Sequence, residues 1–124
     1  MKDNKTLGGR GEDLASGYLQ RKGYRILARN YRNVYGEIDI IARVRSTICF
    51  IEVKTRADDS CGSGIEAISK YKMGKISRAA AGYLTDNDLW DSEARFDVVA
   101  VRLENGRPAE IELVADAFEF VPLG

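Results

Sequence analysis

Two strongly apolar segments lie close together near the middle of the sequence, at residues 36–43 (GEIDIIAR) and 47–54 (TICFIEVK). Both are rich in residues that favour β-strands. The three residues between them form a connection of a length typical of a β-hairpin. The sequence therefore predicts an antiparallel pair of core strands, and the rest of the chain must fold around that pair.

The remaining sequence predicts helices and strands on both sides of the hairpin. In chain order we expect a helix at 9–22 that ends at Gly23, a strand at 24–29, the hairpin, a helix at 66–84, and strands at 94–104 and 109–114. Polar turns or loops are expected at 30–35, 55–64 and 105–108. The order αβββαββ predicts an α/β fold with a mixed sheet. The length predicts one domain, 1–124, with its core at about 8–120.

Alternation along the hairpin strands predicts which side chains share a face of the sheet. Asp39 is expected on one face with Ile41, and Ile38 and Ile40 are expected on the opposite face. On the second strand, Glu52 and Lys54 share a face. Charges inside apolar strands are costly unless they are paired or coordinate an ion. The three charged residues are therefore candidates for a functional site, with an ion pair on a solvated strand face as the alternative.

The register of the hairpin decides whether Asp39 meets Glu52. A three-residue turn pairs Arg43 with Thr47, and Asp39 then lies opposite Ile51 and diagonal to Glu52. A one-residue bulge would bring both carboxylates onto a common face. The sequence leaves these two arrangements open.

The chain contains no histidine, so Ser-His-Asp and Cys-His catalysis are excluded. If Asp39 and Glu52 converge, they would hold magnesium, which accepts one or two protein carboxylates with waters and phosphate oxygens. Lys54 would then hold an attacking water or neutralise charge on a phosphate. Glu12 is either a fourth acid of the site or a first-turn residue that complements the helix dipole. Glu37 is either a second metal ligand or a solvent-side acid.

Positive charge is unevenly distributed, although the net charge is zero. Residues 1–35 hold eight Lys/Arg against three Asp/Glu, whereas residues 84–124 hold three against ten. A positive face for nucleic acid and an intermixed surface are both compatible with this pattern. For the second helix, a solvated face is the alternative to phosphate binding. The candidate nucleic-acid-binding residues are Arg32, Arg56, Lys70, Lys72, Lys75 and Arg78.

Several motifs occur together along the chain. They are GEDLA at 11–15, GYRIL at 23–27, NYR at 30–32, GEIDIIA at 36–42, FIEVKTR at 50–56, Lys70, and RFDVV at 95–99. With them the chain resembles the YraN-like family of small, mostly uncharacterised bacterial proteins with an endonuclease-like fold. That family is similar to archaeal Holliday-junction resolvases and, more remotely, to type II restriction enzymes.

The resemblance implies a restriction-endonuclease-like fold with a D…E-x-K active site. Asp39, Glu52 and Lys54 match that site, Glu12 matches the helix acid of the resolvases, and Glu37 belongs to the family's own motif. The implied cofactor is magnesium, or manganese in its place. Resolvases commonly act as homodimers, so a homodimer is implied by analogy.

We therefore expect a metal-dependent endonuclease that acts on structured or branched DNA. A nucleic-acid-binding module with little or no catalysis is one alternative, and a structural or interaction protein is another. The chain has no apolar run of about 18 residues or more, and its N-terminal segment is polar, so neither a transmembrane helix nor a signal peptide is expected. A cytoplasmic protein with no membrane partner is the expectation.

Overall fold

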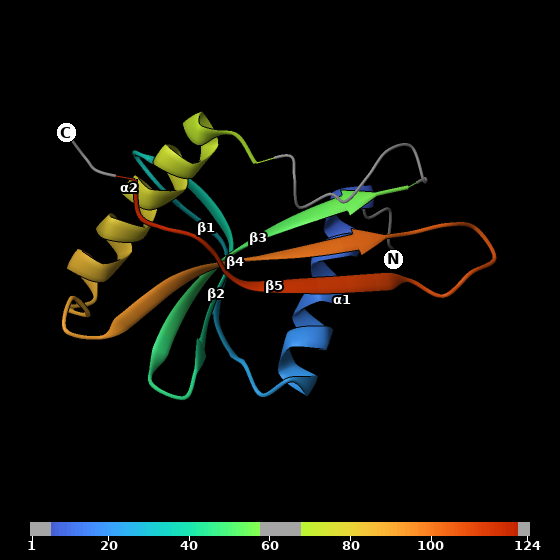
Figure 1. Ribbon diagram of the computed structural model, residues 1–124, viewed down its shortest axis with the longest axis horizontal. Coiled ribbons are helices and arrows are strands. Elements are labelled where there is room, and N and C mark those ends of the chain that lie inside the picture. The colour runs from blue at the N-terminus through green and yellow to red at the C-terminus, as the bar shows by residue number, and fades with distance from the viewer. Residues whose placement is uncertain (1–5, 58–67, 122–124) are drawn as a thin grey trace.

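The computed structural model describes residues 6–57 and 68–121. Helices and strands follow the order αβββαββ, which confirms the predicted α/β architecture with a mixed sheet (Figure 1). The elements are α1 (Leu7–Arg21), β1 (Arg25–Asn33), β2 (Gly36–Val44), β3 (Thr47–Arg56), α2 (Lys70–Asp86), β4 (Glu93–Arg102) and β5 (Glu110–Phe118). In the described part of the chain, no helix is long and apolar enough to cross a membrane.

Within the described residues, five strands form one sheet in the order β1-β2-β3-β4-β5. β3 and β4 are parallel and are joined through α2, as parallel neighbours require a crossover connection. The other neighbouring strands are antiparallel. β1 and β2 turn away from β3 toward α2, whereas β3, β4 and β5 run on together (Figure 1). β2 and β3 therefore separate at the end of the hairpin that carries the charged residues.

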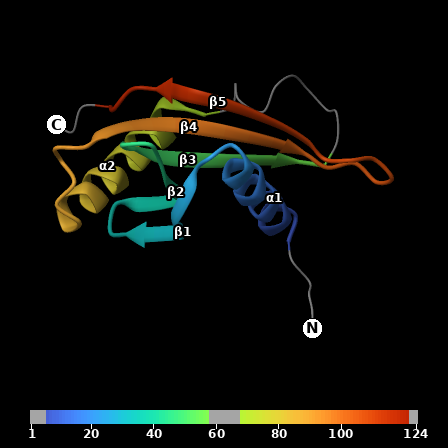
Figure 2. The ribbon, with the colours of Figure 1, turned by 90° about the horizontal axis from the view of Figure 1, so that it is seen from below.

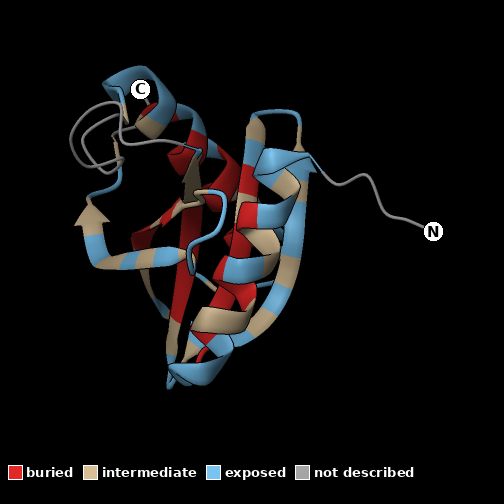
Figure 3. Cartoon of the chain, turned by 90° about the vertical axis from the view of Figure 1, so that its right-hand side faces the viewer, coloured by how far each residue is buried: buried red, intermediate tan, exposed pale blue. Residues whose placement is uncertain are grey.

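The two helices cover opposite faces of the sheet and lie toward its different ends (Figure 2). Leu19 of α1 belongs to the same buried cluster as Ile40 and Ile51. The residues next to these on the strands, Ile41 and Phe50, belong to the cluster under α2. Buried residues are concentrated in the central strands and on the helix sides that face them (Figure 3). β2 and β3 are therefore core strands that are covered on both faces.

Helix α1 is fixed at both ends and packs unusually close to β3. Its N-cap is Thr6, whose hydroxyl accepts a hydrogen bond from the helix. It is followed by Gly23, which has a φ of 95° and confirms the predicted stop. A Cβ atom at Gly11 would lie 1.9 Å from Oγ1 of Thr55. This close approach holds the neighbouring Glu12 at the end of β3.

The sequence predicts a turn at residues 30–35. This prediction is wrong for residues 30–33, because β1 extends to Asn33. Tyr31 pairs with Ile38 of β2, so a polar segment continues the edge strand. Edge strands accept polar side chains, since one side of the strand faces solvent. Asn30 interrupts the strand with a left-handed conformation, at a φ of 53°.

The connection between β2 and β3 is one residue shorter than predicted. Val44 pairs with Thr47, so the turn consists of Arg45 and Ser46 alone. Two-residue hairpin turns need a positive φ, and Arg45 provides it with a φ of 56°. Arginine is not a typical residue for this conformation, and the sequence therefore gave no signal for the shorter turn.

Other predicted boundaries also shift, and β5, predicted to end at residue 114, runs to Phe118. β3 extends to Arg56 into the predicted loop, and the part of that loop after residue 57 lies outside the described residues. The start of the predicted helix 66–84 also lies outside them in part. α2 begins at Lys70, after Ser69, whose hydroxyl accepts a hydrogen bond from the Lys72 N–H.

Candidate functional site

The register of the β2–β3 hairpin brings Asp39 level with Glu52. The strands pair as far as Ile40 and Ile51, and the next pair in the same register would be Asp39 and Glu52. Backbone pairing stops there, and Oδ2 of Asp39 accepts a hydrogen bond from the Val53 N–H at 2.8 Å. The predicted placement of Asp39 opposite Ile51 is wrong, because the turn has two residues and not three.

The alternation of side chains along β2 is interrupted at Asp39. Ile38 and Ile41 both pack in the cluster under α2, although they are three residues apart, whereas Ile40 packs on the α1 side. The prediction that Ile38 shares a face with Ile40 is therefore wrong. Among the described residues Asp39 has no backbone-paired residue on either neighbouring strand, and Asn30 distorts β1 at the same level. This irregularity allows the carboxylate of Asp39 to turn toward β3.

The carboxylate of Asp39 is buried next to that of Glu52. The pKa of Asp39 rises from 3.8 to about 7, because burial penalises its charged form and because Glu52 repels that charge. The Val53 N–H opposes the rise, whereas Glu12 and a side-chain hydrogen bond with Glu52 add to it. Glu52 is only 6% exposed. Two acids in this situation cannot both ionise cheaply unless a cation lies next to them.

Lys72 of α2 supplies a cation to this pair. Its Nζ forms an ion pair with Oε2 of Glu52. Burial lowers the pKa of Lys72, but the hydrogen bond and the negative charge of Glu52 outweigh burial and raise it. The alternative of an exposed Glu52 paired with Lys54 is therefore wrong. Sequence reasoning missed this contact, because residue spacing does not reveal which helix residue meets a strand.

Glu12 faces the site from α1. The helix-dipole alternative is wrong, because α1 begins at Leu7 and its first turn contains no acid. Burial raises the pKa of Glu12, and Arg29, whose Nη2 lies 3.9 Å from the carboxylate, lowers it. The charge of Glu12 contributes to the raised pKa of Asp39. Glu12 is thus a third acid near the pair.

Two basic residues predicted for the site line a hollow beside Glu52. Lys54 and Arg56 border it together with Lys72, and its volume is about 230 Å³. Lys54 forms no ion pair with the residues that the structure describes. Nε of Arg56 is buried without a hydrogen-bond partner among them. The hollow therefore offers positive charge directly beside a buried carboxylate.

The other predicted residues lie farther out. Glu37 forms an exposed ion pair with Arg32 at 3.5 Å, on the rim of the site. Lys75 lines a larger groove that also includes Lys72. Among the described residues, neither Lys70 nor Arg78 forms an ion pair with Asp39 or Glu52. Arg78 borders a separate hollow. The structure thus brings together the acids and the nearest lysines, and leaves Lys70 and Arg78 on the exposed side of α2.

The residues present fit a magnesium ion of the kind that binds through few protein ligands. Asp39 and Glu52 provide two carboxylates, and magnesium accepts one or two of these and completes its shell with waters and phosphate oxygens. Within residues 6–57 and 68–121, no cluster of three or more His, Cys, Asp or Glu side chains is arranged to hold a metal. Further ligands would therefore have to be waters and phosphate oxygens.

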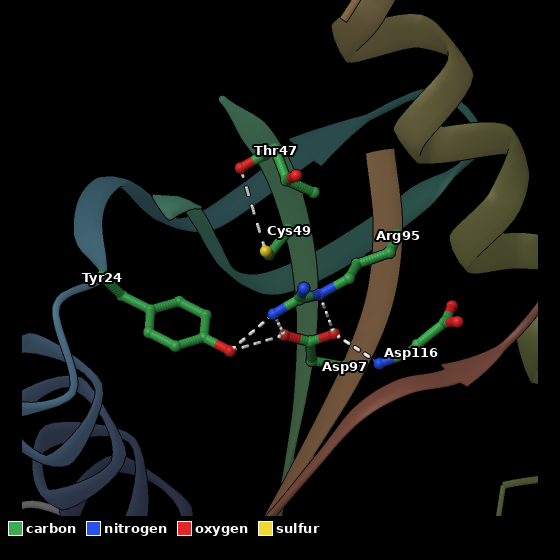
Figure 4. A network of polar contacts seen from close by, with 6 residues as sticks. All are labelled: Tyr24, Thr47, Cys49, Arg95, Asp97 and Asp116. Carbon is green, nitrogen blue, oxygen red and sulfur yellow. Dashed lines mark hydrogen bonds and ion pairs between the residues drawn. The ribbon is translucent and has the colours of Figure 1, made fainter. Parts of the chain in front are cut away.

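A second polar cluster, in which Tyr24, Arg95 and Asp97 are bonded to one another, lies on the α1 face of the sheet (Figure 4). Buried Asp97 accepts hydrogen bonds from the Tyr24 hydroxyl at 3.1 Å, Nε of Arg95 at 3.0 Å and the Asp116 N–H at 2.9 Å. Burial, and then Asp97, raises the pKa of Tyr24 to about 12 and that of the Cys49 thiol to about 12. Because these groups satisfy one another, the cluster is structural. It joins β4 to β5 and to the start of β1.

Comparison with known sequences places the chain in a family. The model of the uncharacterised protein family UPF0102 matches residues 11–101. The chain belongs to this family. The resemblance to YraN-like proteins is thereby confirmed.

UPF0102 proteins from several bacteria are similar to this chain over most of its length. The relative from Pelobacter propionicus is 47% identical, over 94% of this chain and 85% of its own. The relative from Geobacter sulfurreducens is 46% identical, over 94% and 91%. The relative from Chlorobium phaeobacteroides is 45% identical, over 94% and 96%. The chain therefore spans nearly the whole length of these relatives.

Proposed function

We propose that this UPF0102 protein is a metal-dependent endonuclease that hydrolyses phosphodiester bonds in structured or branched DNA. The observation that carries the proposal is the buried carboxylate pair Asp39 and Glu52, in which the pKa of Asp39 rises to about 7. Keeping such a pair inside a core hairpin is costly, so a role in holding a cation is the simplest reason for it. The resemblance to D…E-x-K nucleases points to the same residues.

Each residue of the site has a role in this proposal. A bound magnesium or manganese ion would polarise the scissile phosphate and lower the pKa of a water molecule. Asp39 and Glu52 would hold the ion, and Glu12 would bind a water in its shell. Lys54 would hold the attacking water or neutralise charge on the phosphate. Lys72 neutralises Glu52, and its ammonium group would be available to a phosphate if Glu52 held the metal.

Cleavage of four-way junction DNA with magnesium or manganese tests the proposal. Asp39→Asn, Glu52→Gln and Lys54→Met should each lower the cleavage rate by about 100-fold or more, as the loss of one charged group at a reacting phosphate typically does. Glu93→Gln is the matched control, because Glu93 is an exposed acid opposite Thr47, at the far end of β3. Circular dichroism checks that the variants fold.

Two results would contradict the proposal. One is cleavage in EDTA at the rate seen with metal, and the other is undiminished cleavage by the Asp39 and Glu52 variants. Binding of junction DNA without cleavage in either metal would instead support a nucleic-acid-binding module of the same fold. We further propose that the protein is cytoplasmic and, by analogy with resolvases, that it forms a homodimer. Analytical ultracentrifugation tests whether the dimer forms.

A further inference from the structure

A groove of about 620 Å³ runs between the β1–β2 turn and the first half of α2. We call it the turn–helix groove. Its walls come from residues 32–37 on one side and from Ser69, Tyr71, Lys72, Lys75 and Ile76 on the other. Lys72 also lines the hollow beside Glu52. Lys72, which forms an ion pair with Glu52, therefore stands between the groove and the carboxylate pair.

Large apolar side chains are exposed along this groove without a role in the core. Tyr71 is 75% exposed, Tyr35 is 52% exposed and Val34 is 91% exposed. By contrast, Tyr31 and Tyr83 pack edge-to-face against each other inside the fold, with ring centroids 5.2 Å apart. Exposed aromatic rings beside a hydrolytic site are available to stack on a flat ligand, and every nucleic-acid base offers a flat face.

The charges of the groove favour an anionic ligand. Arg32, Lys72 and Lys75 line it. Arg32 pairs with Glu37 and Lys72 with Glu52, whereas Lys75 forms no ion pair among the described residues and leaves the groove with an excess of positive charge. Nζ of Lys75 lies 5.6 Å from the centroid of the Tyr71 ring. A base that stacks on this ring would thus place its phosphate close to a lysine. Cations interleaved with exposed aromatic rings are typical of proteins that bind single-stranded nucleic acid.

We propose that the turn–helix groove binds an unpaired nucleotide of the substrate strand and directs that strand to Asp39 and Glu52. The base stacks on Tyr71 and Tyr35, and the backbone phosphates face Lys75 and Lys72. A base inside an intact duplex hides both of its faces in the stack, so these rings select a single-stranded segment such as the one at a branch or flap. The proposal rests on the proposed nuclease function and names the feature of DNA that the protein recognises.

Binding of a short single strand of DNA that carries one 2-aminopurine tests the proposal in EDTA, where no cleavage is required. Stacking on tyrosine quenches the fluorescence of 2-aminopurine, so we expect quenching on binding to the wild type. Tyr71→Leu should weaken binding by about tenfold and abolish most of the quenching, since stacking on one aromatic side chain contributes that much per base. Because Tyr71 is mostly exposed, this variant should fold, and circular dichroism checks that it does.

The chain offers a matched control on its other helix. Tyr18 of α1 and Lys22, the C-cap of that helix, repeat the spacing of Tyr71 and Lys75 but lie outside the groove. Nζ of Lys22 lies 5.4 Å from the centroid of the Tyr18 ring. Tyr18→Leu should leave the affinity and the quenching unchanged. Equal binding by Tyr71→Leu and the wild type would overturn the proposal. So would an equal loss of affinity for blunt duplex DNA, because the ring would then not select unpaired bases.

This experiment separates the groove from the catalytic site. Single-strand binding that depends on Tyr71, in a protein that cleaves nothing with either metal, would uphold the groove and contradict the nuclease function. Cleavage that requires Asp39, combined with single-strand binding that is unchanged in Tyr71→Leu, would support the nuclease function and contradict the proposed role of the groove.

Discussion

Replacing Asp39 by asparagine tests the electrostatic argument for the site at nearly constant size. Asp39 faces Glu52 on β3 and Glu12 on α1, and Lys72 of α2 reaches it through Glu52. Burial, and then repulsion from Glu52, raises its pKa from 3.8 to about 7. The amide oxygen of asparagine can still accept the hydrogen bond from the Val53 N–H, so the loss of charge is the main change.

The raised pKa makes the wild type less stable as the pH rises. Between about pH 4 and pH 7 the folded protein keeps on Asp39 a proton that the unfolded chain has released, so the free energy of unfolding falls across this range. At roughly 1.4 kcal/mol per pKa unit, the loss is about 1 kcal/mol at pH 4.5 and approaches about 4 kcal/mol at pH 8. Asparagine carries no charge, and the advantage of the variant should therefore grow with pH.

Urea unfolding in metal-free buffer at about pH 4.5 and about pH 8 measures the difference in the free energy of unfolding. We expect Asp39→Asn to exceed the wild type by about 2–4 kcal/mol at pH 8 and by about 1 kcal/mol at pH 4.5. Glu93→Gln, an exposed control, should stay within about 0.5 kcal/mol of the wild type throughout. Magnesium at about 100 times its Kd should add about 2.7 kcal/mol to the wild type and little to the variant. An Asp39→Asn variant that is no more stable than the wild type at about pH 8 would refute the reasoning.

Two further predictions concern how the site is held in place. Gly11→Ala introduces a Cβ atom 1.9 Å from a β3 side chain and should lower the free energy of unfolding by about 1–3 kcal/mol. Its control Gly8→Ala meets nothing within 4 Å and should raise it by up to about 1 kcal/mol in chemical denaturation. Asp97→Ala leaves the Arg95 guanidinium without its buried carboxylate and should cost about 3 kcal/mol or more. The double replacement of Arg95 and Asp97 by alanine should cost less than the two single changes together, and additive costs in thermal unfolding would contradict a coupled pair.

Much of the fold follows from local pattern. The apolar runs at 36–43 and 47–54 predict the two core strands, and the order of the remaining elements follows from periodicity and turn residues. Gly23 as the stop of α1 was predictable for the same reason, since only a residue without Cβ adopts its φ of 95° cheaply. Sequence alone also placed three of the charged residues at the open end of the hairpin.

The features that sequence could not supply depend on tertiary contacts or on unusual backbone conformations. Arg45 adopts a left-handed conformation that its residue type does not favour, and this single residue changes the register of the hairpin. The interruption of alternation at Asp39 coincides with a second such residue, Asn30, on the neighbouring strand. The ion pair of Lys72 with Glu52 depends on where α2 packs against the sheet. A pattern of local periodicity carries no information on that contact.

The crossover that brings Lys72 to Glu52 also sets the order in which the site can assemble. The β2–β3 hairpin closes through two residues and can form early, whereas the contact of Lys72 with Glu52 needs the longer loop to α2 to close and the helix to dock on the sheet. We therefore expect the two acids to meet before Lys72 reaches them. Like charges would then oppose closure of the hairpin's open end, and we expect a proton shared by the two acids to favour that closure. Refolding should accordingly accelerate as the pH falls from about 8 to about 6.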